Sequence, residues 1–282
     1  MRKPLFGKRL KMALGGGIVI LITLMAVLAP YVAPFDPYQQ SLMERLKPPV
    51  WQAEGSWSHL LGTDNYGRDL LSRLIFGSRL SLLVGVAAMV LSCALGSSLG
   101  LIAGYKGGKL EKLILALADA HLAFPGILLA ILIVAAIGGS ALNLILVLGV
   151  SAWMVYARVA FGLTRSLKTR PFVEAAVSNG APDGYVIWRH ILPHIIPVLT
   201  VISTLQVAQM ILQETALSFL GLGLPPPAAT WGNMLAEGRD RLWVAPWIAH
   251  FAGLAIIVVV WAINLLGNGL QEHLDPKSRV LE

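Results

Sequence analysis

Long apolar stretches alternate with short charged segments along the 282 residues of the chain. A helix needs about 20 mainly apolar residues to cross a bilayer, and several stretches reach that length. The stretch 113–157 is too long for one crossing, and the turn signal Gly138-Gly139-Ser140 divides it in two. We therefore predict an all-α membrane protein with six transmembrane helices, at 12–33, 80–105, two within 113–157, 195–220 and 243–270.

Basic residues precede the first apolar stretch, as they do in a cleaved signal peptide. The stretch is long for a signal sequence, and five further spans follow it. We therefore expect a retained first span, 12–33, behind a basic tail, 1–11.

The distribution of Lys and Arg predicts the orientation of the spans. Only 13% of residues are charged, against about a quarter in a soluble domain. Most of the 22 basic residues lie in the segments that share a side with the N-terminus, and basic loops stay in the cytoplasm. We expect cytoplasmic termini (1–11 and 271–282), an extracytoplasmic segment (34–79) and a permease core (80–270). The net charge of +7 follows from this pattern, so nucleic acid is not an expected partner.

The extracytoplasmic segment is too long to be a turn. Leu70, Leu71, Leu74 and Ile75 recur at helical spacing, which predicts a short amphipathic helix along the membrane surface. The segment is either a structural cap joining two spans or a docking surface or gate, and both readings stay open. Its candidate residues are Gly62, Thr63, Asp64, Gly67, Arg68, Asp69 and Arg73.

A second unusual segment, 164–194, lies on the cytoplasmic side of the predicted topology. It contains Glu174-Ala175-Ala176, then Gly180, then Pro193. This pattern predicts a short helix, a glycine break, a second short helix and a proline that opens the fifth span. Small alanine side chains let a helix approach a groove on a partner closely. The alternative is an amphipathic linker on the membrane surface.

This second segment resembles the EAA loop of binding-protein-dependent ABC importer permeases. The resemblance rests on Glu174-Ala175-Ala176, Gly180 and Leu192-Pro193. His190 stands where the general pattern has Ile, but 189–193 is similar to the peptide and nickel branch. Similarity to the second permease of dipeptide and oligopeptide importers extends over 61–64, 67–69, 72–73, 218–223, 231–232 and 274–276.

The resemblance implies a location and a set of partners. The chain would lie in the bacterial inner membrane and form half of a peptide pathway with a related permease. An extracytoplasmic solute-binding protein would deliver the solute, and two cytoplasmic ATPase subunits would consume ATP and Mg²⁺. Nickel complexes and glutathione are alternative solutes. The family's coupling helix, seated in the ATPase, would correspond to Glu174, Ala175, Ala176, Gly180, Leu192 and Pro193.

The chain shows no sequence signature of a catalytic site. A phosphate-binding Gly-x4-Gly-Lys-Ser/Thr loop is missing from the sequence, so we expect no cofactor on this chain. His190 and His194 have metal-ligand spacing, but no acid lies nearby and Pro193 interrupts them, so we expect no metal. The same shortage of acids argues against a membrane enzyme.

Two acids fall in or near predicted spans, where ionisable groups are costly and usually face protein or water. Glu214 either lines the pathway, together with Trp231, or is hydrogen-bonded between helices, which we favour; Asp119 is expected to be structural. A self-sufficient carrier or channel is the competing class of function, and it would need paired charges deep in the spans or broken helices. Pro125 is expected to kink the third span.

Overall fold

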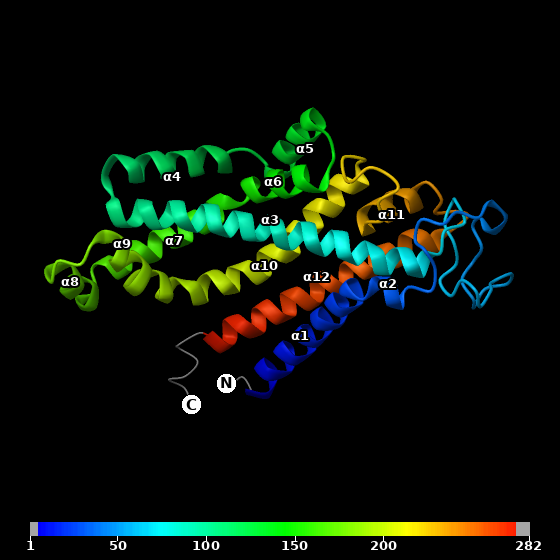
Figure 1. Cartoon of the computed structure of the whole chain (residues 1–282), viewed down its shortest axis with the longest axis horizontal. Coiled ribbons are helices and arrows are strands. Elements are labelled where there is room, and N and C mark those ends of the chain that lie inside the picture. Colours follow the sequence, from blue (N-terminus) through cyan, green and yellow to red (C-terminus); the bar gives the residue numbers. More distant parts are fainter. Residues whose placement is uncertain (1–4, 275–282) are drawn as a thin grey trace.

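The computed structural model describes residues 5–274, which form helices joined by irregular segments. The ends of both predicted tails, and the motif residues Asp275 and Pro276, lie outside this range. Figure 1 shows the arrangement of the chain. The α-helices are α1 (Leu5–Val27), α2 (Ala29–Val32), α3 (Leu70–Lys106), α4 (Gly108–Leu122), α5 (Gly126–Ile137), α6 (Ala141–Ser151), α7 (Trp153–Lys168), α8 (Pro171–Ser178), α9 (Asp183–Tyr185), α10 (Leu192–Phe219), α11 (Trp231–Arg239) and α12 (Pro246–Leu274). Leu42–Glu44 is a 3-10 helix and Val186–Ile191 a π-helix.

Five helical runs are long and apolar enough to cross a membrane. A sixth crossing is formed if α4 and α5 together count as one bent span, and in this sense the number agrees with the predicted six. The kink predicted at Pro125 is confirmed, because α4 and α5 meet there at 86°. The five runs are Arg9–Val27, Leu70–Lys106, Ala141–Lys168, Asp183–Phe219 and Pro246–Leu274.

The predicted surface helix at 70–75 is wrong. These residues are the first turns of α3, which continues without a break for 37 residues. Leu70 and Ile75 are buried, since Leu70 packs into the cluster that includes Trp231 and Ile248. Helical spacing identified the helix but could not show that it runs straight into the next span.

The predicted separation of the second short helix from the fifth span is also wrong. From Asp183 the chain stays helical through the π-helix into α10. Pro193 does lie in the first turn of α10, where the missing N–H of proline is tolerated. The helix α11 was not predicted, although Thr230 caps it by accepting a hydrogen bond from the Asn233 N–H.

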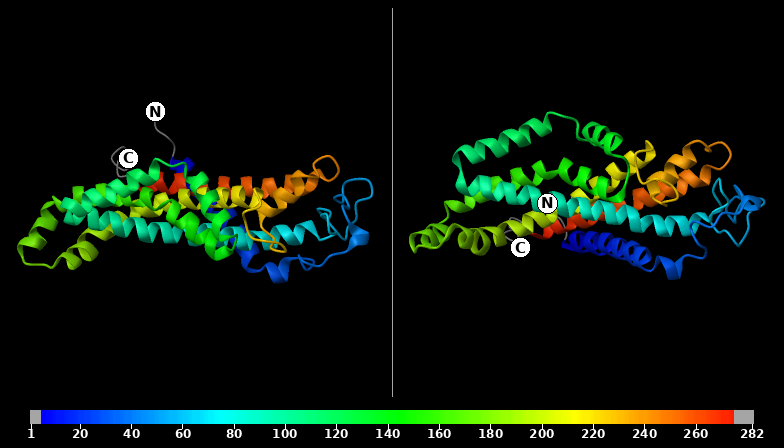
Figure 2. Two further views of the ribbon diagram at one scale, coloured as in Figure 1. Left: turned by 90° about the horizontal axis from the view of Figure 1, so that it is seen from above. Right: turned by 45° about the horizontal axis from the view of Figure 1, so that its top comes forward.

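The irregular segment 33–69 and the α8–α9 hairpin lie at opposite ends of the bundle, and α3 runs between them (Figures 1 and 2). Helix α1 lies along α12, and Lys11 Nζ pairs with Glu272 Oε1 at 2.7 Å. This contact joins the start of α1 to the end of α12. The two ends of the described chain are therefore on the same side of the bundle.

Three glycines on α3 form a seam against α7, which we call the glycine seam: Gly96, Gly100 and Gly104. A Cβ at Gly96 would lie 2.1 Å from the Trp153 carbonyl oxygen, and one at Gly100 would lie 2.3 Å from that of Ala157. Small residues spaced four apart let helix backbones approach closely, which is how helices associate in lipid. The glycine seam therefore sets the α3–α7 distance.

We predict that Gly100→Ala destabilises the protein by about 1–3 kcal/mol, because its methyl group overpacks the α3–α7 contact. The matched control is Gly162→Ala on α7, where an added Cβ meets nothing within 4 Å. That control should be neutral or stabilising by up to about 1 kcal/mol through helix propensity. Thermal unfolding of the purified protein in detergent measures both, and equal midpoints for the two variants would refute the close-approach argument.

Candidate functional site: a coupling segment and a buried ion network

The candidate coupling segment, 169–193, is called the coupling segment below, and its first helix ends in a defined motif. Helix α8 begins with Pro171 in its first turn and ends before Gly180, whose φ is +81°. The Gly180 N–H donates to the Val177 carbonyl and the Ala181 N–H to that of Ala176. This pair of bonds is the Schellman motif, in which a left-handed residue, usually glycine, closes the helix. The predicted glycine break is therefore confirmed.

The exposed face of α8 carries part of the predicted motif. Glu174 and Ala175 are exposed, whereas Ala176 is partly buried against its own chain. Val173, on the opposite face, is completely buried. The predicted small-residue contact with a partner is therefore open to Ala175 more than to Ala176. Large apolar side chains also lie exposed around α8 and the π-helix, namely Phe172, Val177, Tyr185 and Trp188.

The coupling segment is tied to the end of α3, and the end of α7 is tied to the same residue of α3. The Tyr105 hydroxyl, at the end of α3, donates to Asp183 Oδ1 at 3.0 Å. Lys168, at the end of α7, donates from Nζ to the Tyr105 carbonyl oxygen at 2.6 Å. Val173 and Val186 belong to the same buried cluster as residues of α3, α7 and α10. The coupling segment therefore packs against three long helices.

Leu192 and Pro193 lie at the junction with α10, Leu192 partly buried and Pro193 exposed. The histidine pair beside them has a local role. His194 Nδ1 lies 2.7 Å from the His190 carbonyl oxygen, and the His194 ring stacks on Phe172 with centroids 5.1 Å apart. Within residues 5–274, these histidines belong to no group of three or more metal-ligating side chains.

At the other end of the bundle, four charged side chains form a buried ion network. The Arg73 guanidinium, wholly buried, pairs with Asp64 and makes two contacts with Glu237, from Nη1 at 2.5 Å and from Nη2 at 3.0 Å. Arg68 Nε contacts Asp64 Oδ2 at 2.6 Å, and Arg68 Nη2 contacts Glu237 Oε2 at 3.1 Å. The network joins the 33–69 segment to α3 and α11.

Asp69 caps the start of α3 and belongs to a second polar cluster beside this network. Its Oδ2 accepts hydrogen bonds from the backbone N–H and the hydroxyl of Ser72, at 2.8 and 2.7 Å. Its Oδ1 lies 2.9 Å from His59 Nδ1, while Nε2 of the same ring lies 3.0 Å from Glu44 Oε2. Two hydrogen bonds hold the pKa of Glu44 below its usual value. The bond from Lys47 has the larger effect and the bond with His59 the smaller.

Five of the candidate side chains in this segment are buried, namely those of Thr63, Asp64, Arg68, Asp69 and Arg73. They are therefore not exposed in this conformation, which favours the structural-cap interpretation. A docking role of the segment stays a prediction. The remaining candidates are two glycines with positive φ, Gly62 and Gly67, where an added Cβ would meet backbone carbonyl oxygens.

Glu214 and Trp231 are also buried within the chain. The Glu214 carboxylate accepts hydrogen bonds from the Ser218 hydroxyl at 2.7 Å and the Ser81 hydroxyl at 3.4 Å, which links α10 to α3. Trp231 Nε1 donates to the Leu74 carbonyl oxygen at 3.0 Å. This geometry is that of an acid hydrogen-bonded between helices, the interpretation favoured above. Asp119 pairs with Arg158 of α7 on an exposed surface.

Two residues of these sites were not identified from the sequence. Glu237 contacts both network arginines but lies 164 positions from Arg73. Tyr105 holds the coupling segment but lies 78 positions from Asp183. Neither has a local pattern that distinguishes it. The cap signal of Thr230 before α11 was the one available hint, and it would have located the helix but not the function of Glu237.

Comparison with known families agrees with this architecture. Residues 96–280 match the family described as binding-protein-dependent transport system inner membrane component. Residues 8–49 match the N-terminal transmembrane domain of oligopeptide transport permease C. The chain therefore belongs to the inner-membrane permeases of binding-protein-dependent transport systems.

Curated relatives place the chain more narrowly, in the branch predicted from its motifs. It is 41% identical to the dipeptide transport system permease protein DppC of Haemophilus influenzae, over 93% of this chain and 88% of that protein. It is 42% identical to the di/tripeptide transport system permease protein DppC of Pseudomonas aeruginosa, over 95% and 89% of the two chains. It is 39% identical to the glutathione transport system permease protein GsiD of Pectobacterium atrosepticum, over 94% and 86%.

We predict that breaking the ion network destabilises the protein. Glu237→Gln or Arg73→Met leaves the network with one uncompensated charge, and removing one partner of a fully buried pair costs about 3–5 kcal/mol. Because the side chain of Glu237 is 24% exposed, we expect the lower end of that range. The double variant should lose less than the sum of the two single losses. Thermal unfolding in detergent measures each.

The control for this experiment is Glu54→Gln, which removes an exposed carboxylate from the same 33–69 segment. It should leave the unfolding midpoint unchanged within about 0.5 kcal/mol. If Glu237→Gln behaved like Glu54→Gln, the network would not hold the segment to the bundle.

Proposed function

We propose that the chain is one of two permease subunits that form the translocation pathway of a peptide importer, and that its coupling segment docks into an ATPase subunit. The observation that carries the coupling assignment is the exposed α8, projecting beyond the bundle, while Val173 on its buried face packs in a cluster with residues of α3, α7 and α10. The partners would be a related permease, two ATPase subunits that use ATP and Mg²⁺, and an extracytoplasmic solute-binding protein.

Short peptides are the proposed solute class. The relatives are named for dipeptides, di- and tripeptides and glutathione, and all of these solutes contain peptide or peptide-like amide bonds. Glutathione and nickel complexes remain as alternative cargoes for the same type of importer. The test is uptake of a labelled dipeptide by cells that carry the whole transporter. Unlabelled dipeptide, glutathione or a nickel complex is added as competitor, and the strongest competitor identifies the preferred solute. Preferential competition by nickel complexes would overturn the peptide proposal.

The proposed mechanism passes force through α8. Closure of the ATPase dimer would move the groove that holds α8, and the Schellman turn would keep the helix at a defined angle to the chain that follows. Tyr105, Lys168 and the buried cluster around Val173 would carry the movement to the long helices. The negative charge of Glu174, in the first turn of α8, stabilises the N-terminal end of that helix. Its side chain is exposed and is therefore available to pair with a basic group of the ATPase.

A pair of substitutions at Gly180 tests this mechanism. Valine at φ +81° carries a backbone penalty of about 1–2 kcal/mol, which lowers the population of the correct turn by about 5–30-fold. Asparagine tolerates the left-handed region, and an added Cβ meets nothing within 4 Å at this position. We expect Gly180→Val to reduce peptide uptake and peptide-stimulated ATP hydrolysis strongly, and Gly180→Asn to retain most of both.

Membrane insertion and pairing with the second permease are the controls for Gly180→Val, and both should be unchanged. Ala175→Trp, on the exposed face of α8, should release the ATPase from the purified complex. Full transport in both Gly180→Val and Ala175→Trp would contradict the coupling assignment.

We also propose the membrane orientation, with the coupling segment in the cytoplasm and 33–69 outside. It is supported by the distribution of basic residues and by the placement of these two segments at opposite ends of the bundle. In a background with Cys93 replaced by serine, cysteines at Gln40 and Asp240 should react with an impermeant reagent in intact cells. A cysteine at Ser178 should react only after permeabilisation, and outside labelling at Ser178 would reverse the orientation. All three positions are exposed.

A further inference from the structure

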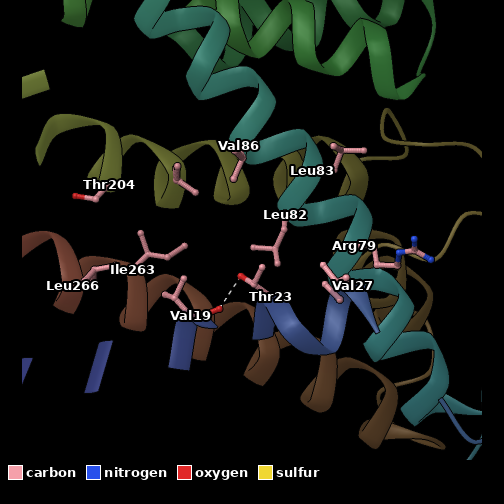
Figure 3. A pocket seen from close by; sticks show the side chains of 12 residues that line it. Val19, Thr23, Val27, Arg79, Leu82, Leu83, Val86, Thr204, Ile263 and Leu266 are labelled. Carbon is pink, nitrogen blue, oxygen red and sulfur yellow. Dashed lines mark hydrogen bonds between the residues drawn. The ribbon is translucent and has the colours of Figure 1, made fainter. Parts of the chain in front are cut away.

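An apolar groove of about 570 Å³ opens on the side of the bundle between α1, α3, α10 and α12 (Figure 3). On α3 it is lined by Arg79, Leu82, Leu83 and Val86, which recur at helical spacing and so share one face. None of the residues used for coupling or for the ion network lines it. The groove is therefore a separate feature from the sites described above.

The walls of the groove offer no unsatisfied hydroxyl donor. Its two threonines, Thr23 on α1 and Thr204 on α10, donate their hydroxyl hydrogens to the carbonyl oxygens of Val19 and Val201, at 2.8 and 2.7 Å. Leu83 is more than half exposed at the mouth of the groove. Surface of this kind within a membrane span suits a hydrocarbon chain.

One charge stands at the end of the groove nearest the 33–69 segment. Arg79 lies beside Val27, the last residue of α1, and its guanidinium points away from Thr204 and Leu266 at the opposite end (Figure 3). The side chain is exposed and, among residues 5–274, has no ion-pair partner. The guanidinium carbon of Arg79 lies over the Phe76 ring, 5.9 Å from the ring centroid.

Arg79 lies beside the end of a candidate membrane span. The candidate span in α1 is Arg9–Val27, and Arg79 lies next to its last residue, so we place Arg79 near the level of the lipid headgroups. An arginine within a span is costly unless it reaches a partner or the interface. A phosphate at this level would supply a partner, since the planar guanidinium binds phosphate oxygens in a bidentate manner.

We propose that this groove binds an anionic phospholipid of the leaflet next to the 33–69 segment, with its phosphate on Arg79 and an acyl chain along α3. Charge complementarity at one end and apolar walls along the rest match the two parts of such a lipid.

Two variants of the intact transporter separate the two halves of the proposed site. Arg79→Gln should weaken retention of phosphatidylglycerol roughly fivefold, as expected for one basic contact with an anionic headgroup, and leave retention of uncharged diacylglycerol unchanged. Leu83→Trp should fill the groove and reduce retention of both lipids. Native mass spectrometry of the purified complex, titrated with each lipid, measures retention.

The matched controls are Arg45→Gln, an exposed arginine in the 33–69 segment, and Val90→Trp, an exposed α3 position that does not line the groove. Both should retain lipid as the unmodified transporter does. Equal retention by Arg79→Gln and the unmodified transporter would overturn the proposal, as would an equal loss in Arg45→Gln.

A photoreactive residue at position 83 identifies the occupant directly. In membranes, crosslinking should add the mass of a phospholipid to this chain. Crosslinking to the second permease would show that a protein segment covers the groove and would refute the lipid site. Peptide uptake by each variant, measured alongside, confirms that the transporter is folded, so lipid loss with retained uptake would be specific to the groove.

Discussion

The close backbone contact between α3 and α7 is the constraint on which the rest of the structure depends. In a bilayer, apolar side chains gain little by leaving the lipid to contact one another, because lipid tails are equally apolar. Helix association therefore relies on close packing. Gly96, Gly100 and Gly104 provide that packing because an added Cβ at any of them would collide with α7. With its position fixed in this way, α3 can act as a rigid element between the two ends of the molecule.

Both specialised regions are attached to α3. At its start, Ser72 donates a hydrogen bond to Asp69 of the 33–69 segment, and Arg73 pairs with Asp64 of that segment and with Glu237 of α11. At its end, Tyr105 holds the coupling segment through Asp183. A 37-residue helix is roughly 55 Å long, so this single element reaches from one specialised region to the other. Under the proposed function, a movement imposed on α8 would reach the opposite face through α3 and its partner α7.

The buried ion network holds the 33–69 segment at the end of the bundle opposite the coupling segment. Two arginines and the Asp64 carboxylate are removed from water, and the Glu237 carboxylate is partly so. Such burial is costly unless each charge is paired and hydrogen-bonded. The pairing joins three separate parts of the chain, so it specifies one arrangement of the 33–69 segment over the bundle. A surface that receives a solute-binding protein would therefore be built from other, exposed residues that this arrangement positions.

Hydrophobic periodicity, charge asymmetry and short motifs were enough to predict the helical membrane class, the family, the kink at Pro125 and the break at Gly180. Each of these depends on local chemistry: the length of an apolar run, the lost N–H of proline, or the absent Cβ of glycine. The continuity of α3 from Leu70, the burial of Arg73 and the role of Glu237 could not be predicted in this way. They depend on contacts between residues far apart in the chain, such as the 164 positions between Arg73 and Glu237, and only folding decides which charges meet and which side chains lose water.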